Sequence, residues 1–237
     1  MLTYVTKSRY WEIIDSGIMV GVPGTKKWHL KDVQDAVVYS YLYEKSGLQI
    51  AEVGAGDSRL LRVLSQTNQC YAIDEYKGAG NGPKRRPDLD NVTFIECSVG
   101  NSGGVIDDES FDIIFSVSVV EHIPHNALPG FFEDCRRILK PGGLMVHLID
   151  AYVESEDGDN AYLWARLNQY KKPFMEGAFR PVGSVRFQTQ KDVAFNTSLA
   201  TNPDDVMREW NRSSPALIEK RKVAQSCAIE MAGYRAR

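Results

Sequence analysis

Short apolar runs alternate with segments of helical periodicity through the middle of the chain. The apolar runs are bounded by glycine or polar residues and predict buried strands over 48–53, 70–73, 92–96, 111–117 and 144–149. Between them, apolar residues recur at helical spacing over 58–66 and 128–139, and Pro141-Gly142-Gly143 predicts the end of the second helix. Strands that alternate with helices at this spacing predict βαβ units and a parallel sheet covered on both faces.

The two flanking regions have weaker patterns. Residues 31–45 have helical spacing and Gly47 predicts the end of that helix, whereas the first thirty residues mix aromatics with glycine and proline and predict an irregular segment, a possible lid. Beyond residue 150 the pattern predicts helices at 157–170, 203–210 and 215–224, extended segments at 185–188 and 193–199, and a closing strand at 226–232. The expected organisation is therefore one domain over residues 1–237.

Composition narrows the class of protein. The chain has 237 residues, of which 43% are hydrophobic and 25% charged, which is typical of a soluble globular domain. A formal net charge of −3 predicts no general attraction to nucleic acid or to an anionic membrane, and Lys84-Arg85-Arg86 is interpreted as a solvated loop. The four cysteines form no C-x-x-C pair, and no apolar stretch approaches the roughly 20 residues of a membrane span. We therefore expect a cytoplasmic protein with reduced cysteines.

The most informative segment is Glu-Val-Gly-Ala-Gly-Asp-Ser at 52–58, which joins a predicted strand to a predicted helix. Glycines at such a junction allow a sharp turn and let a ligand approach the backbone. A dinucleotide is disfavoured, because the third glycine of that pattern falls on Arg59 and because Glu52 would repel a pyrophosphate. A cationic cofactor would instead be attracted by Glu52.

Acidic residues also end the second predicted strand. Asp74, followed by Glu75, lies about eighteen residues past Gly56. A carboxylate at this position can accept hydrogen bonds from both ribose hydroxyls of an adenosine ligand, and nicotinamide enzymes share this feature. Asp74 therefore supports an adenosine-containing ligand without choosing between cofactors, and its alternative role is that of a turn residue.

Five motifs in order resemble the class I S-adenosylmethionine-dependent methyltransferases, in particular the group often called type 11 or type 12. They are the loop at 52–58, Ala-Ile-Asp at 72–74, Asn-Val-Thr-Phe-Ile-Glu-Cys-Ser at 91–98, the strand and Glu-His-Ile-Pro segment at 111–124, and Ile-Leu-Lys-Pro-Gly-Gly at 138–143. The resemblance covers about 48–150. It implies a Rossmann-like three-layer α/β/α sandwich, with a mainly parallel seven-stranded sheet and an antiparallel final strand.

The resemblance also implies roles for single residues. The methionine part of the cofactor, S-adenosyl-L-methionine, would lie at the glycine loop, its ribose at the acids that end the second strand, and its adenine at the residues after the third strand. Ser116 would lie beside the cofactor. The residues are Glu52, Gly54, Ala55, Gly56, Asp74, Glu75, Ser98, Val99 and Ser116. The family usually has aspartate where this chain has Ser98, which weakens the expected hold on adenine. Residues 1–46 would form an N-terminal lid and helix, 47–150 the cofactor-binding core, and 151–237 an acceptor-side insertion and sheet completion.

Methyl transfer needs an aligned acceptor and, for a hydroxyl, a group that removes its proton. His122 follows the fourth predicted strand and is the candidate general base, although it can equally cap a helix or pack beside the cofactor. A metal site formed by Glu121, His122 and His125 is a further alternative, but the spacing is loose and we predict no metal.

The class of methyl acceptor is predicted from the acceptor motifs that the sequence lacks. The chain lacks the Asn/Asp-Pro-Pro-Tyr/Phe segment of enzymes that methylate planar amino groups and the Pro-Cys pair of pyrimidine carbon methylation. We therefore expect a small-molecule acceptor, methylated at oxygen, such as a sugar or natural-product hydroxyl, with aromatics at Tyr10, Trp11, Trp28 and His29 as pocket or lid residues. The alternatives are a nicotinamide oxidoreductase, a non-catalytic partner subunit with this fold, and a protein or RNA methyltransferase.

Overall fold

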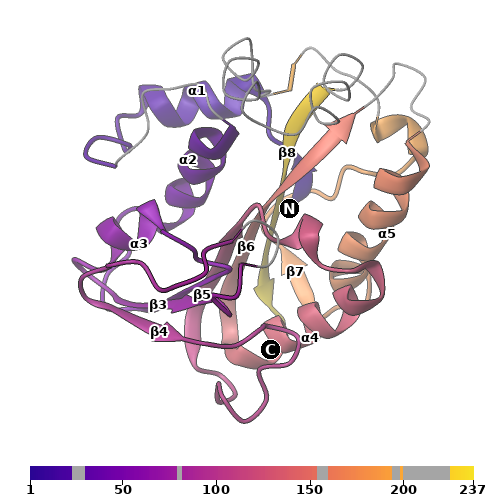
Figure 1. Cartoon of the computed structure of the whole chain (residues 1–237). Helices are drawn as coiled ribbons and strands as arrows, with labels where there is room; N and C mark the ends of the chain where they lie inside the picture. The colour runs from indigo at the N-terminus through magenta and orange to yellow at the C-terminus, as the bar shows by residue number, and fades with distance from the viewer. Residues whose placement is uncertain (23–29, 79–81, 154–159, 194–197, 200–224) are drawn as a thin grey trace.

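The computed structural model describes residues 1–22, 30–78, 82–153, 160–193, 198–199 and 225–237. One sheet runs through the centre of the molecule in the order β4-β3-β2-β5-β6-β8-β1, and β7 pairs with β8 outside this path (Figure 1). The strands are β1 (Leu2–Tyr4), β2 (Gln49–Val53), β3 (Gln69–Ile73), β4 (Val92–Ile95), β5 (Phe111–Val117), β6 (Leu139–Val153), β7 (Phe179–Pro181) and β8 (Gln225–Arg235).

Helices cover both faces of this sheet, as the alternating pattern predicts. The helices are α1 (Lys7–Asp15), α2 (Leu30–Leu42), α3 (Arg59–Leu64), α4 (Leu128–Ile138) and α5 (Ala161–Met175). The apolar sides of α1, α2 and α3 share one buried cluster with one face of the sheet, and those of α4 and α5 share a second cluster with the other face. The result is a three-layer α/β/α sandwich.

The sheet direction agrees with the predicted class. Strands β2 to β6 pair in parallel, and β8 is antiparallel to β6 and to β1. The path therefore contains seven strands with an antiparallel final strand, and β7 makes an eighth. The parallel strands bring their carboxyl ends to one edge of the sheet, which is where open α/β sheets bind ligands.

The prediction for the amino terminus was wrong. Instead of an irregular segment, the chain begins with β1, which pairs with β8 through Leu2 and Met231, and continues into α1. Thr6 caps this helix, its hydroxyl accepting a hydrogen bond from the Arg9 N–H. A three-residue strand whose partner lies more than 220 residues away gives no local pattern, so periodicity alone could not find it.

The boundary between α4 and β6 also differs from the prediction. The strand begins at Leu139, five residues earlier than expected, and pairs there with Phe111 before the register shifts between Phe111 and Ile113. The irregularity accommodates Pro141-Gly142-Gly143, where Gly142 has a φ of +79°. The glycines therefore mark a bulge within the strand rather than a loop before it.

The carboxy-terminal third is confirmed only in part. Helix α5 begins at Ala161 and continues to Met175, five residues past the predicted end, and β8 contains the predicted closing strand. The expected extended segment at 185–188 is reduced to an isolated bridge between Val185 and Leu2, and residues 190–193 form a 3-10 turn. The predicted helices at 203–210 and 215–224 and most of 193–199 lie outside the described residues. Within the described ranges, no helix is long and apolar enough to cross a membrane.

Candidate active site

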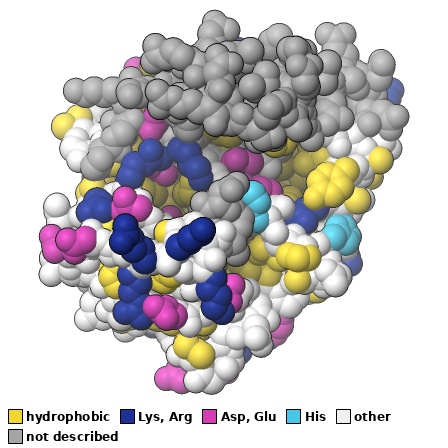
Figure 2. Space-filling view, in the orientation of Figure 1, with side chains coloured by type: hydrophobic (Ala, Val, Ile, Leu, Met, Phe, Trp, Pro, Cys, Tyr) yellow, Lys and Arg dark blue, Asp and Glu magenta, His cyan; other side chains and the backbone are white. Residues whose placement is uncertain are grey.

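A cavity of about 1070 Å³ opens at the carboxyl ends of the parallel strands. It lies between the loops that follow β2, β3, β4 and β5, with α2 on one side and α4 on another. Figure 2 shows the hollow with lysine and arginine side chains on its rim. Small-ligand pockets measure roughly 300–1,000 Å³, so this cavity has room for a cofactor and a small second ligand.

The glycine loop forms the floor of the cavity and follows β2 directly. Gly54 has a φ of +63°, and a Cβ atom built on it would lie 2.5 Å from a methyl carbon of Val119. Only glycine fits this close approach, so the loop and the residues after β5 share a packed contact. Ser58 then caps α3, its hydroxyl accepting from the Leu61 N–H at 3.0 Å. Gly54, Ala55 and Gly56, which the sequence predicts as cofactor-binding residues, all line the cavity.

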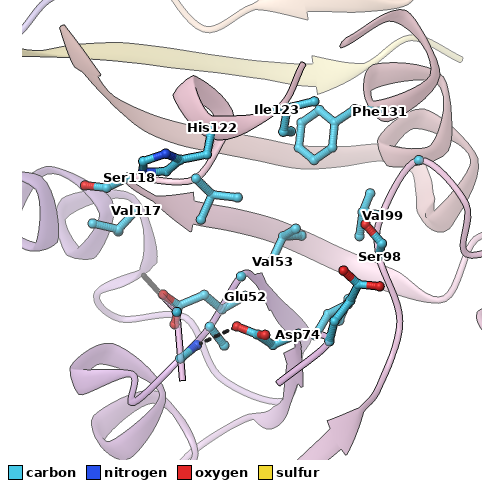
Figure 3. Close-up of a pocket in the computed structure, with 18 of the residues that line it drawn as sticks. Glu52, Val53, Asp74, Ser98, Val99, Val117, Ser118, His122, Ile123 and Phe131 are labelled. Atoms are coloured by element: carbon cyan, nitrogen blue, oxygen red, sulfur yellow. Dashed lines mark hydrogen bonds between the residues drawn. The ribbon is translucent and has the colours of Figure 1, made fainter. Parts of the chain in front are cut away.

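Asp74 lies at the end of β3, beside the glycine loop, and Glu75 follows it on the cavity wall. One Asp74 carboxylate oxygen accepts from the Gly56 N–H at 3.2 Å (Figure 3), and the other accepts from the Tyr76 N–H at 2.8 Å. Each carboxylate oxygen has a second lone pair, so Asp74 can still accept a ligand's hydroxyl groups. The two acids that the sequence singled out are therefore brought to the loop.

Glu52 is buried beneath the loop, and the Ser58 hydroxyl donates a hydrogen bond to its carboxylate. Burial raises the pKa of Glu52 to about 8, against the opposing effect of the Ser58 hydrogen bond, and nearby Asp35 raises it further. Burial likewise raises the pKa of Asp35 to about 6, although Arg59 lowers it through an ion pair of 2.6 Å. This end of the cavity is therefore an acidic site that is protonated in part at neutral pH.

Sequence reasoning missed two residues of this end of the cavity. Lys31 and Asp35 line it from α2. Arg59, the first residue of α3, connects α3 to α2 through ion pairs with Asp35 and Asp32. Arg59 entered the sequence analysis only as evidence against a dinucleotide. No spacing rule links α2 to the glycine loop more than fifteen residues later, so a fold was needed to place them together.

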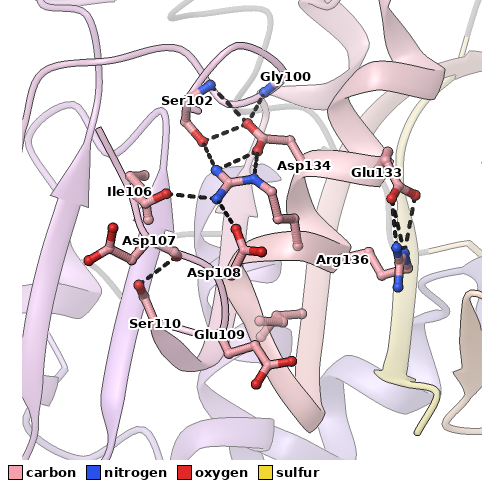
Figure 4. Close-up of polar contacts among 12 residues, drawn as sticks. Gly100, Ser102, Ile106, Asp107, Asp108, Glu109, Ser110, Glu133, Asp134 and Arg136 are labelled. Carbon is pink, nitrogen blue, oxygen red and sulfur yellow. Dashed lines mark hydrogen bonds and ion pairs between the residues drawn. The ribbon is translucent and has the colours of Figure 1, made fainter. Parts of the chain in front are cut away.

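Ser98 and Val99, the residues predicted to flank adenine, line the cavity after β4, and Gly100 and Asn101 extend this wall. The loop is held from behind by Asp134 of α4, which accepts from the Gly100 N–H at 2.7 Å and from the Ser102 N–H and hydroxyl (Figure 4). Arg137 completes the network with hydrogen bonds to Asp134, Ser102 and the Ile106 carbonyl. The loop predicted to form the adenine wall is thus held by hydrogen bonds to α4.

Ser116 does not reach the cavity, which corrects the prediction for this residue. It is fully buried in β5, where its hydroxyl lies 2.7 Å from Nδ1 of buried His147, away from the glycine loop. Ser118 lines the cavity instead and has a φ of +54°. Its hydroxyl lies 2.9 Å from Gln34 Oε1 and 2.8 Å from Asp150 Oδ1. A non-glycine residue in this conformation is strained and is held here by its hydrogen bonds.

His122 lines the cavity from the 3-10 turn η2 (Val120–His122), and its side chain is 53% exposed (Figure 3). Its Nε2 lies 3.9 Å from Glu121 Oε1, too far for a hydrogen bond. Both Glu121 carboxylate oxygens are buried without a hydrogen-bond partner among the described residues, and burial raises the pKa of Glu121 well above its usual value.

His125 belongs to a separate turn and lies 3.1 Å from the amide nitrogen of Gln169. Among the described residues, no group of three or more histidine, cysteine, aspartate or glutamate side chains is arranged to hold a metal ion. The arrangement of Glu121, His122 and His125 considered from the sequence is therefore not assembled in this part of the chain. The aromatics Tyr10 and Trp11 lie on α1 and not on the cavity wall, and Trp28 and His29 lie outside the described residues.

Comparisons with known proteins agree with this geometry. Residues 51–147 match the family described as "Methyltransferase domain". A ubiquinone biosynthesis O-methyltransferase from Chelativorans sp. (strain BNC1) is 30% identical over 100 residues, which cover 42% of this chain and only 39% of that protein.

Solved structures of the same fold include geranyl diphosphate C-methyltransferase from Streptomyces coelicolor A3(2), with a TM-score of 0.56, 14% identity, and coverage of 97% of this chain and 86% of that one. A phosphoethanolamine N-methyltransferase 2 from Haemonchus contortus has a TM-score of 0.54 and 16% identity, over 85% of this chain and 52% of that chain. At these identities the likeness is one of fold.

Proposed function

We propose that the chain is a class I S-adenosylmethionine-dependent methyltransferase and that it transfers a methyl group to an oxygen atom of a small molecule. The observation that supports this most directly is the cavity itself, in which the glycine loop, Asp74 and the turn bearing His122 face one space. Residues 47–150 supply the cofactor side in this proposal, with 1–46 and 151–237 completing the sheet and the acceptor side.

The donors around the cavity fit S-adenosyl-L-methionine. Glu52 and Asp35 form an acidic end that suits an ammonium group, and Lys31 and Arg59 beside them suit a carboxylate. Asp74 is placed to accept from ribose hydroxyls. Arg59 stands where the dinucleotide pattern has its third glycine, which disfavours the nicotinamide alternative. When bound, the cofactor supplies an activated methyl group on a sulfonium.

The protein's own contribution is alignment and proton removal. His122 reaches the cavity from η2, where a neutral imidazole can accept the proton of an acceptor hydroxyl. Ser118, fixed by Asp150 and Gln34, forms the wall beside it and can orient the same hydroxyl. An acceptor oxygen is favoured over carbon because these groups handle a dissociable proton. The four cysteines are free, which suits the reducing cytoplasm that we propose as the location.

Binding of S-adenosylhomocysteine and of NAD, measured by isothermal titration calorimetry, tests the cofactor. We expect micromolar binding of the first ligand, none of the second, and loss of binding in Asp74→Ala, while Asp88→Ala, outside the cavity, keeps it. A folded protein that binds neither ligand would favour the alternative of a non-catalytic partner subunit. Transfer of a labelled methyl group is then screened over phenols, catechols and sugars, with peptides and RNA as the competing acceptor classes.

A further inference from the structure

Arg166 is a buried arginine of α5, 3% exposed, whose guanidinium faces the turn that carries His122. Its Nη2 donates to the Val120 carbonyl at 2.6 Å, and its Nη1 donates to the Ile123 carbonyl at 2.7 Å. Its Nε donates to the Tyr170 hydroxyl at 3.0 Å, one helical turn further along α5. Two nitrogens of this buried guanidinium thus connect α5 to the turn that follows β5, and the third donates a hydrogen bond within α5.

The turn has few hydrogen bonds of its own to stabilise its conformation. η2 has no side-chain cap, and its internal hydrogen bonds are those from the His122 N–H to Val119 and from the Ile123 N–H to Val120. The Val120 carbonyl, which also accepts from the Ile123 N–H, and the Ile123 carbonyl both face α5, and Arg166 gives each of them a charge-assisted hydrogen bond. The planar fork of an arginine can satisfy both carbonyls at once, which a lysine ammonium cannot do as rigidly.

The same turn forms part of the cavity. Val119, at one end of it, packs against Gly54 of the glycine loop, and His122 projects from its other end into the cavity. Movement of the turn would therefore displace the imidazole relative to the cofactor side. A displacement of about 1 Å can reduce a rate by roughly a hundredfold.

We propose that Arg166 is the positioning residue for His122, and that α5 thereby sets the acceptor-side geometry of the active site. This inference rests on the proposed function. Arg166 lies outside residues 51–147, so it belongs to the part of the chain that the family match does not describe. It touches no cavity space itself and acts through two backbone carbonyls.

Imidazole carbon–proton NMR spectra provide a readout that does not need the acceptor. The chain has four histidines, so the His122 resonance can be assigned with His122→Gln. In the wild type we expect a single His122 resonance that shifts when S-adenosylhomocysteine is added. In Arg166→Met we expect the ligand to bind within about threefold of wild type, while the His122 resonance broadens or splits and its shift on binding is lost.

Hydrogen exchange of the turn distinguishes positioning from general destabilisation. Loss of Arg166 should raise exchange at the His122 and Ile123 amides about tenfold or more, with the β2 and β6 amides unchanged as internal references. Arg166→Lys retains the charge and should show a partial effect, and it replaces the methionine variant if that variant fails to fold. The matched control is Arg136→Met, which removes a solvent-exposed arginine of α4 whose partner is Glu133.

The outcomes separate the two proposals. Wild-type protein that fails to bind S-adenosylhomocysteine would overturn the proposed function. Normal binding together with an unchanged His122 resonance and unchanged turn exchange in both Arg166 variants would overturn the positioning role alone. Once an acceptor is known, Arg166→Met should lower kcat far less in a His122→Gln background than in the wild type, since the two residues act through one group.

Discussion

Glu52 offers a quantitative test of the cofactor site, because its carboxyl group must change protonation when a cation binds beside it. Burial raises its pKa to about 8 in the free protein. An ammonium group placed against it would favour the ionised form, so binding well below pH 8 should release close to one proton per ligand. The linkage has a definite sign: affinity for S-adenosylhomocysteine rises with pH until Glu52 is ionised in the free protein.

The size of the effect follows from that pKa. With a pKa of about 8, roughly 3% of free Glu52 is ionised at pH 6.5 and roughly 24% at pH 7.5, so affinity should rise about eightfold across this interval. The window begins above the pKa of about 6 for Asp35 and ends before an α-amino group loses its own proton near pH 8. Lys31 and Arg59 also face Glu52 and lower its pKa, against the larger effect of burial.

Calorimetry in buffers of different ionisation enthalpy measures both the affinity and the proton released. Glu52→Gln should bind roughly tenfold more weakly at pH 7.5 and lose the pH dependence, because glutamine cannot ionise. Glu75→Gln is the matched control on the same cavity wall and should retain the slope. A wild-type affinity that is flat between pH 6.5 and 7.5, or a slope that survives in Glu52→Gln, would refute the reasoning.

Three further predictions concern the frame of the site. Gly54→Ala should weaken S-adenosylhomocysteine binding at least tenfold by calorimetry, since the new Cβ meets Val119, and Val119→Ala should restore part of the loss. In urea unfolding, Asp134→Ala should lower the free energy of unfolding by about 3 kcal/mol, because buried donors lose their acceptor (Figure 4). The control Glu133→Ala, at an exposed position, should change it by less than about 0.5 kcal/mol. Similar losses in the two variants would contradict this prediction. Burial lowers the pKa of His147 to about 3, so its contribution to stability is complete above pH 6.5 and is lost towards pH 3. Between pH 7 and pH 5 this loss should be about 2 kcal/mol, and His147→Leu should lack it; an equal slope in the variant would exclude His147 as the source.

Much of the cofactor side could be predicted because its residues lie next to strand ends. Gly54, Asp74 and Ser98 each follow an apolar run, and parallel strands bring such positions to one edge. The prediction that Ser116 borders the site was wrong for a local reason. The strand ends at Val117, and the left-handed conformation of Ser118 turns the next side chain into the cavity, a change that a strand pattern does not contain.

The remaining residues could not be predicted because they depend on distant pairings. β1 joins the sheet only through β8 near the other end of the sequence, and α2 meets the glycine loop only after the sheet has formed. Arg166 has helical spacing like its neighbours, and nothing in that pattern distinguishes a buried guanidinium from a solvated one. Its role follows from two carbonyls more than forty residues earlier.

The turn at 119–123 contacts both a segment that the sequence predicted and a residue that it did not predict. One side of it packs on Gly54 of the predicted loop, and the other is held by Arg166 of the unpredicted helix. In the proposed function the cofactor and acceptor sides therefore share one wall, and only its α5 side lies outside the family match. If Arg166 positions His122 as proposed, changes in α5 would move His122 and leave the glycine loop and Asp74 in place.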